Sequence, residues 1–166
     1  MSHEIRAAAG AAISQLVQLR GTNIITWSDI DAGFKVNGQA IKFASKAVGI
    51  FKPKELTDGA ALSIKQVVPS RSGRTAPYDD RDLGSGMVAY SLEKSGRDNH
   101  LLSEAYKRNA PLIFFRGVAD ALYEVIFPVF VASFGSNDSE AIIRLSGDNE
   151  ENNLNRTDLL NEPLAK

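Results

Sequence analysis

The stretch PLIFFRGVADALYEVIFPVFVASF, residues 111–134, decides the fold class. Its first five residues form a short, strongly apolar run, and residues 121–134 are almost continuously apolar and aromatic, which favours β-strands. Pro128 lies inside the second run, and proline cannot donate a hydrogen bond to a central strand ladder. We therefore expect one or two strands here, with a break or a sheet edge at Pro128.

Helical patterns lie on either side of further strand candidates. Apolar residues recur at helical spacing over residues 3–19, and Gly21 can supply a left-handed helix end. Residues 99–108 predict a second helix, and residues 26–30 predict a turn or a short helix capped by Ser28.

The strand candidates are short and are separated by turn residues. Asn37-Gly38 lies between two short alternating stretches, which is a strong hairpin signal because both residues tolerate positive φ. Residues 61–68 alternate like a half-buried strand, residues 87–92 and 141–145 are further candidates, and residues 69–86 look like a long loop. The order predicts an α+β fold with an N-terminal helix and one inserted helix, and the many short strands suggest a closed or partly closed β-barrel.

Length and composition limit the chemistry. The 166 residues suit one domain, which we place at residues 1–146, followed by an acidic linker or tail over residues 147–166. The chain has no cysteine and two histidines, so it has no thiolate zinc site, cysteine nucleophile or histidine-rich metal site. No apolar run reaches the ~20 residues that span a bilayer, and no signal peptide is visible, so we expect a cytoplasmic protein without membrane contact.

The net charge of −1 hides a local basic excess. Residues 35–74 contain two acidic side chains and eight basic ones, namely Lys35, Lys42, Lys46, Lys52, Lys54, Lys65, Arg71 and Arg74. Such an excess is typical either of a face that binds a polyanion or of a solvated surface balanced by the acidic C-terminal residues.

No convincing catalytic set is present. No Walker A or complete dinucleotide motif occurs, and Asp79, Asp80 and Asp82 have no visible acid–lysine partner for a nuclease core. An aromatic beside acids, as in Tyr78-Asp79-Asp80, suits instead the reading of a flipped base, since an aromatic stacks and a carboxylate accepts from cytosine. The alternative is that Tyr78 packs on the barrel and an aspartate caps a turn.

An ordered series of motifs resembles a known family. The series is GIFKP at residues 49–53, LSI at 62–64, PYDD at 77–80, DNHLL at 98–102, PLIFF at 111–115, then Tyr123 and PVFV at 128–131. It resembles the N-terminal, SRA-like domain (PUA superfamily) of bacterial HNH restriction endonucleases that attack modified DNA, over roughly residues 5–134.

The resemblance implies a curved or partly closed, SRA-like β-barrel that binds duplex DNA and flips one modified base into a pocket, with 5-methylcytosine or 5-hydroxymethylcytosine as the expected targets. The implied base-pocket residues are Tyr78, Asp79, Asp80, Phe51, Ser63, Tyr90 and Asn99. The implied DNA-backbone contacts are Lys52, Lys54, Lys65, Arg71 and Arg74.

The resemblance also implies a bacterial, cytoplasmic type IV restriction system. There a C-terminal HNH nuclease domain cuts the DNA, and a homodimer could form through the full-length protein. We expect no catalysis, cofactor or metal for the present chain. Two alternatives stay open: a PUA-like RNA-binding or protein-interaction module, and a small metal-dependent nuclease using Asp79 to Asp82.

Overall fold

The structure is a computed structural model, and it describes residues 2–67, 81–84, 86–92, 98–135 and 139–145, of which the side chains of residues 81–84 are not described. The elements in chain order are α1 (Ser2–Arg20), β1 (Ile24–Thr26), α2 (Trp27–Asp31), β2 (Phe34–Val36), β3 (Gln39–Ile41), β4 (Ile50–Phe51), β5 (Ser63–Gln66), β6 (Arg81–Gly84), β7 (Met87–Ser91), α3 (Asn99–Arg108), β8 (Leu112–Ala119), β9 (Leu122–Phe134) and β10 (Glu140–Leu145).

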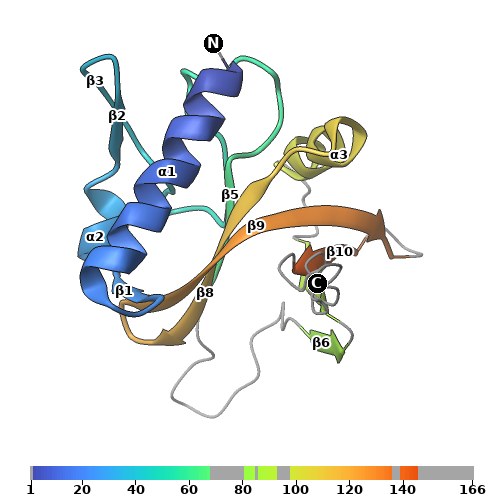
Figure 1. Ribbon diagram of the computed structural model, residues 1–166. Coiled ribbons are helices and arrows are strands. Elements are labelled where there is room, and N and C mark those ends of the chain that lie inside the picture. The colour runs from blue at the N-terminus through green and yellow to red at the C-terminus, as the bar shows by residue number, and fades with distance from the viewer. Residues whose placement is uncertain (1, 68–80, 85, 93–97, 136–138, 146–166) are drawn as a thin grey trace, which may run out of the picture.

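Eight strands form one sheet in the order β4-β5-β8-β9-β10-β7-β6, with β1 paired to β9 (Figure 1). The pairing of β5 with β8 is parallel, and the other pairings are antiparallel. The sheet curls into a half-barrel. Three strands separate β7 from β5 in the sheet, yet the Tyr90 hydroxyl of β7 donates to the backbone carbonyl of Lys65 in β5. The predicted α+β half-barrel with an N-terminal helix is confirmed.

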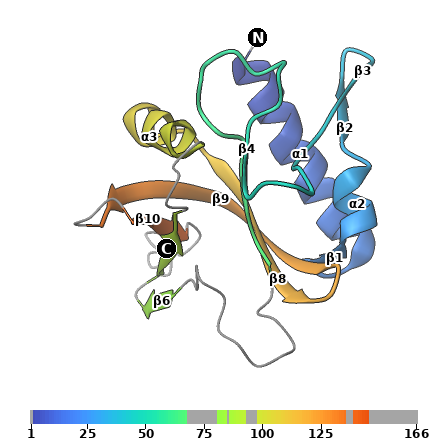
Figure 2. The same ribbon diagram turned by 180° about the vertical axis from the view of Figure 1, so that it is seen from behind.

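The two faces of the sheet carry separate cores. Along β8, Leu112 and Phe114 pack into the interior of the half-barrel with α3, whereas Ile113 and Phe115 pack into the cluster beneath α1. Figure 2 shows α1 and α3 on different sides of the sheet. The prediction that residues 61–68 form a half-buried strand is wrong, because β5 is covered on both faces and its polar Lys65 is buried as well.

β9 is one strand of 13 residues, so the predicted break or edge at Pro128 is wrong. Its register against β8 shifts between Leu112 and Phe114, and its register against β10 shifts between Ile142 and Ile143. Such bulges leave one residue out of the ladder, so a residue without an N–H is tolerated inside the sheet. They also bend the strand, which contributes to the curl seen in Figure 1.

Local sequence signals explain the smaller elements. Asn37 and Gly38 both have positive φ, 52° and 83°, in the predicted hairpin between β2 and β3. α2 is the predicted short helix, but Thr26 caps it rather than Ser28: the Thr26 hydroxyl accepts from the Asp29 N–H, and the Asp29 carboxylate accepts from the Thr26 N–H. The predicted loop over residues 69–86 contains strand β6.

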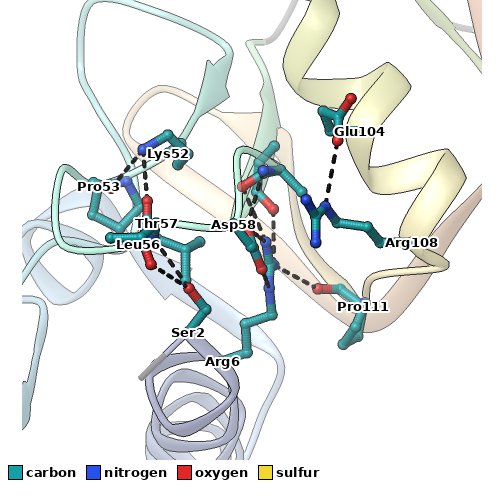
Figure 3. A network of polar contacts seen from close by, with 12 residues as sticks. Ser2, Arg6, Lys52, Pro53, Leu56, Thr57, Asp58, Glu104, Arg108 and Pro111 are labelled. Atoms are coloured by element: carbon teal, nitrogen blue, oxygen red, sulfur yellow. Dashed lines mark hydrogen bonds and ion pairs between the residues drawn. The ribbon is translucent and has the colours of Figure 1, made fainter.

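Arg6 ties α1 to the loop between β4 and β5 (Figure 3). Its guanidinium donates to both carboxylate oxygens of Asp58, at 3.0 and 2.9 Å, and to the carbonyls of Ala60 and Ala61 at 3.0 and 2.9 Å. Burial alone would raise the pKa of Asp58, but the hydrogen bonds and the charge of Arg6 outweigh it and hold that pKa below its usual range. In this way the loop that enters β5 is fixed against α1.

Among the described residues, no helix is long and apolar enough to cross a membrane. The described residues also hold no cluster of three side chains suited to a metal ion. Of the aspartates considered for a metal, Asp79 and Asp80 lie outside the described residues, and the side chain of Asp82 in β6 is not described.

Candidate functional site

The rim of the half-barrel, where β5 and β7 meet across the interior, contains a polar recess. The Tyr90 hydroxyl donates to the carbonyl of Lys65 at 3.0 Å, and the N–H of Lys65 donates to the carbonyl of Gly49 at 2.8 Å. The Tyr90 ring stands edge-on to Phe114 at 6.3 Å between centroids. The residues that line the recess are Val48, Gly49, Ile50, Tyr90, Ser91, Asp98 and Asn99.

The recess combines an aromatic ring with hydrogen-bonding groups. Asp98 precedes α3 without making a side-chain cap bond to it, and Asn99 begins the helix. A carboxylate and an amide are groups that can pair with the edge of a base. The volume is ≈ 60 Å³, however, which is room for about four water molecules and less than the roughly 300 Å³ of a small ligand site. The described residues therefore do not by themselves enclose enough space for a base.

The structure brings some of the predicted pocket residues together and separates others. Tyr90 and Asn99 share the recess. Ser63 is fully buried, and its hydroxyl donates to the carbonyl of Phe43 at 2.7 Å in the cluster on the α1 side. Phe51 is half-buried on β4, paired with Ser63. Tyr78, Asp79 and Asp80 lie outside the described residues, so their role stays a prediction.

The predicted DNA-backbone lysines have three different environments. Lys54 is exposed. Lys52 is half-buried, and its ammonium donates to the carbonyls of Pro53 and Leu56 at 3.3 and 2.7 Å, as Figure 3 shows. Lys65 is 8% exposed, and burial lowers its pKa. Of these three, Lys54 is therefore the lysine whose side chain lies at the surface; Arg71 and Arg74 lie outside the described residues.

Comparison with known proteins gives one structural likeness to report. No family model matches the sequence, and no curated protein matches it. Among solved structures the chain is similar to the SRA domain of SUVH5, crystallised in complex with hemi-methylated CG DNA. The two are 17% identical with a TM-score of 0.46, and the likeness covers 62% of this chain and 76% of that chain.

Sequence reasoning gave no role in the site to Gly49 or Asp98, although both line the recess. For Gly49 the reason is geometric: a Cβ there would lie 2.7 Å from the Tyr90 hydroxyl and 3.0 Å from the Lys65 carbonyl. The approach of β7 to this point is a property of the curled sheet, and no local pattern around Gly49 contains it. For Asp98 the available signal was its place just before a helix, which suggests a cap rather than a recess wall.

Gly49→Ala should destabilise the protein by about 1–3 kcal/mol, because the added methyl group would push the Tyr90 hydroxyl from the carbonyl of Lys65. Urea unfolding measures the change. Gly135→Ala is the matched control, since its nearest neighbour would be the Cβ of Glu140 at 3.4 Å, an ordinary contact. Equal effects of the two substitutions would contradict the close approach at Gly49.

Proposed function

We propose that this chain binds duplex DNA carrying a modified cytosine, 5-methylcytosine or 5-hydroxymethylcytosine, and flips that base out of the helix. In this proposal it is the specificity domain of a bacterial, cytoplasmic type IV restriction endonuclease. A C-terminal HNH domain would supply the cutting, and the full-length protein could dimerise. These roles follow the family that the motif series resembles.

The observation that carries the proposal is the polar recess at the rim of the half-barrel. Base flipping needs a cavity at an accessible edge, an aromatic face for stacking, and acceptors for the Watson–Crick edge. The recess presents Tyr90 with the carboxylate of Asp98 and the amide of Asn99. Asp98 is a suitable acceptor for the exocyclic amine of a cytosine, since it makes no side-chain cap bond to α3.

The recess must be completed before it can hold a whole base. The predicted pocket residues Tyr78, Asp79 and Asp80 belong to the segment that joins β5 to β6. Both strands belong to the same curled sheet, and β6 is paired with β7, the strand that carries Tyr90. In the proposal, Tyr78 and one of Asp79 or Asp80 line the pocket for the flipped base.

The direct experiment is fluorescence anisotropy of the full chain with three duplexes that differ only at one central base: cytosine, 5-methylcytosine or 5-hydroxymethylcytosine. The proposal expects tighter binding to one of the modified duplexes. A structured RNA is the fourth probe, because it separates this function from a PUA-like RNA-binding module. Equal affinity for all three duplexes, or preference for the RNA, would reject the proposal.

Salt dependence tests the DNA-backbone contacts. If Lys54 neutralises one phosphate, Lys54→Ala should lower the log–log slope of affinity against salt by about 0.9 and weaken modified and unmodified duplexes alike. Lys107 of α3 is the control, since it is exposed and paired with Glu104 at 3.4 Å. Lys54 would be excluded as a phosphate contact if the DNA affinity of the wild type did not change with salt concentration. It would also be excluded if Lys107→Ala reduced the salt slope as much as Lys54→Ala.

We also expect the chain alone to leave DNA uncut with Mg²⁺ or Mn²⁺, because the sequence lacks cysteine and a paired acid–lysine core. A plasmid-nicking assay measures this, and Asp79→Ala identifies the origin of any cleavage. Cleavage that disappears in Asp79→Ala would instead support the small metal-dependent nuclease.

A further inference from the structure

A buried cation and a buried phenol lie on the face of the sheet opposite the recess. Lys65 of β5 is 8% exposed, and Tyr123 of β9 is 9% exposed. The ammonium nitrogen of Lys65 lies 5.7 Å from the centre of the Trp27 ring, and the ring centroids of Trp27 and Tyr123 are 6.3 Å apart. Trp27, the first residue of α2, therefore links the two.

The sheet register explains how these residues approach one another. Lys65 pairs with Phe115 of β8, and Tyr123 pairs with Gly117, two positions further along the same strand. Phe115 and Tyr123 belong to the cluster beneath α1, and Lys65 alternates with Ile64, which points into the half-barrel. Gly117 has no side chain, so this position of β8 adds none to that face of the sheet.

Neither polar group is satisfied by the described part of the chain. There, the Lys65 ammonium has no hydrogen bond and no carboxylate within ion-pair distance, and the Tyr123 hydroxyl has no hydrogen bond. Buried polar groups in native proteins are nearly always paired, and a buried charge without a counter-charge is costly. Burial accordingly lowers the pKa of Lys65 and raises the pKa of Tyr123.

The nearest charged pair on the neighbouring strands does not supply the missing partner. Arg116 and Glu124 pair with each other at 3.8 Å, and Arg116 lies over the ring of Phe114, on the interior side of the sheet. An ammonium group donates and cannot accept, and a phenol donates readily. The complement that would satisfy both groups is therefore an acceptor with negative charge.

We propose that Lys65, Tyr123 and Trp27 form a binding site for a single phosphate group. The phosphate accepts hydrogen bonds from the Lys65 ammonium and the Tyr123 hydroxyl, and it supplies the counter-charge that the buried amine lacks. The Trp27 ring forms the wall beside the ammonium. The group could belong to a free phosphate or to a DNA backbone, and the site does not depend on the reading of a modified base.

Trp27 is the only tryptophan of the chain, so its fluorescence reports on this site alone. Inorganic phosphate is titrated into the full-length protein at constant ionic strength, with chloride as the balancing anion. The wild type should give a saturable change. Lys65→Met, which keeps an apolar stem and removes the charge, should weaken binding at least about tenfold, and Tyr123→Phe should weaken it less. Lys107→Met is the control for loss of an exposed lysine, because Lys107 is 68% exposed and has no role in the proposed sites.

Thermal melting gives a second reading that does not rely on the tryptophan signal. Phosphate should raise the melting temperature of the wild type, relative to chloride at equal ionic strength, and should not raise that of Lys65→Met. No saturable change in the wild type, or equal responses in the wild type and Lys65→Met, would overturn the proposal. Adding unmodified duplex identifies the source: competition with inorganic phosphate assigns the site to a DNA phosphate, and independent binding assigns it to a free one.

Discussion

Arg6→Ala should lower the free energy of unfolding by about 3–5 kcal/mol, because it removes one partner of a largely buried ion pair. The side chains of Arg6 and Asp58 are 9% and 17% exposed, and the substitution also leaves the carbonyls of Ala60 and Ala61 without their guanidinium donor. The loss is comparable to the whole stability of a marginal domain. Urea unfolding followed by circular dichroism measures it.

Two comparisons make this expectation specific. Arg20→Ala removes another arginine–aspartate pair with two hydrogen bonds, to Asp29. The Arg20 side chain is 50% exposed, so this substitution should change the free energy of unfolding little.

The pKa of Asp58 is held low in the folded state. The stability that Asp58 contributes is therefore present above its unfolded pKa and is lost as the pH falls through the folded pKa. The difference in the free energy of unfolding between the wild type and Arg6→Ala should therefore become smaller at acidic pH. A gap that is constant with pH would contradict a role for the Asp58 charge.

Tyr78→Ala should remove most of the preference for modified DNA while leaving the salt-dependent background. Stacking on an aromatic side chain contributes ~1–3 kcal/mol per base, so the ratio of affinities should fall by about 5- to 150-fold. A hydrogen bond to a charged acceptor contributes a further ~1.5–3 kcal/mol. Together the two terms could offset the few kcal/mol needed to unstack and unpair a base.

The measurement is 2-aminopurine fluorescence beside the modified base, together with binding affinity. Asn in place of Asp79 or Asp80 keeps one acceptor and should retain more discrimination than Ala. Tyr106→Ala is the control, since that exposed tyrosine lies on α3 against Phe134. Tight binding of modified DNA without a fluorescence rise would exclude flipping. Full discrimination in Tyr78→Ala would move the pocket toward Tyr90 and Phe51.

Elements with local signals could be predicted from the sequence. The helical spacing of residues 3–19, the Asn37-Gly38 turn and the helix over residues 99–108 each depend on neighbours in the chain, and all three agree with the structure. Pro128 could not be placed in the same way. Whether a proline fits a strand depends on the register of the two adjoining strands, and a shift of register beside Pro128 is a tertiary property.

The candidate site was harder to predict from the sequence, because its contacts also depend on the tertiary arrangement of the strands. The alternation of Ser63 and Lys65 with apolar residues suggested a solvent-facing side, but Phe43 and Trp27 cover that side of β5. The contact of Tyr90 with the Lys65 backbone joins strands that are not neighbours in the sheet, so no periodicity contains it. Residue types could only suggest candidate side chains, because the curl of the sheet determines which of them meet.

The place of β10 in the sheet has a consequence for how the chain folds during synthesis. β10 is the last of the described strands, yet it lies between β9 and β7 and so joins the β7–β6 pair to the remainder of the described sheet. β6 and β7 leave the ribosome before α3, β8 and β9, but β10, which pairs with β7, follows all of these. The strand that carries Tyr90 can therefore join the sheet only after residue 145 has left the ribosome. A polypeptide that ends at residue 134 would lack β10, the strand that connects β7 to β9.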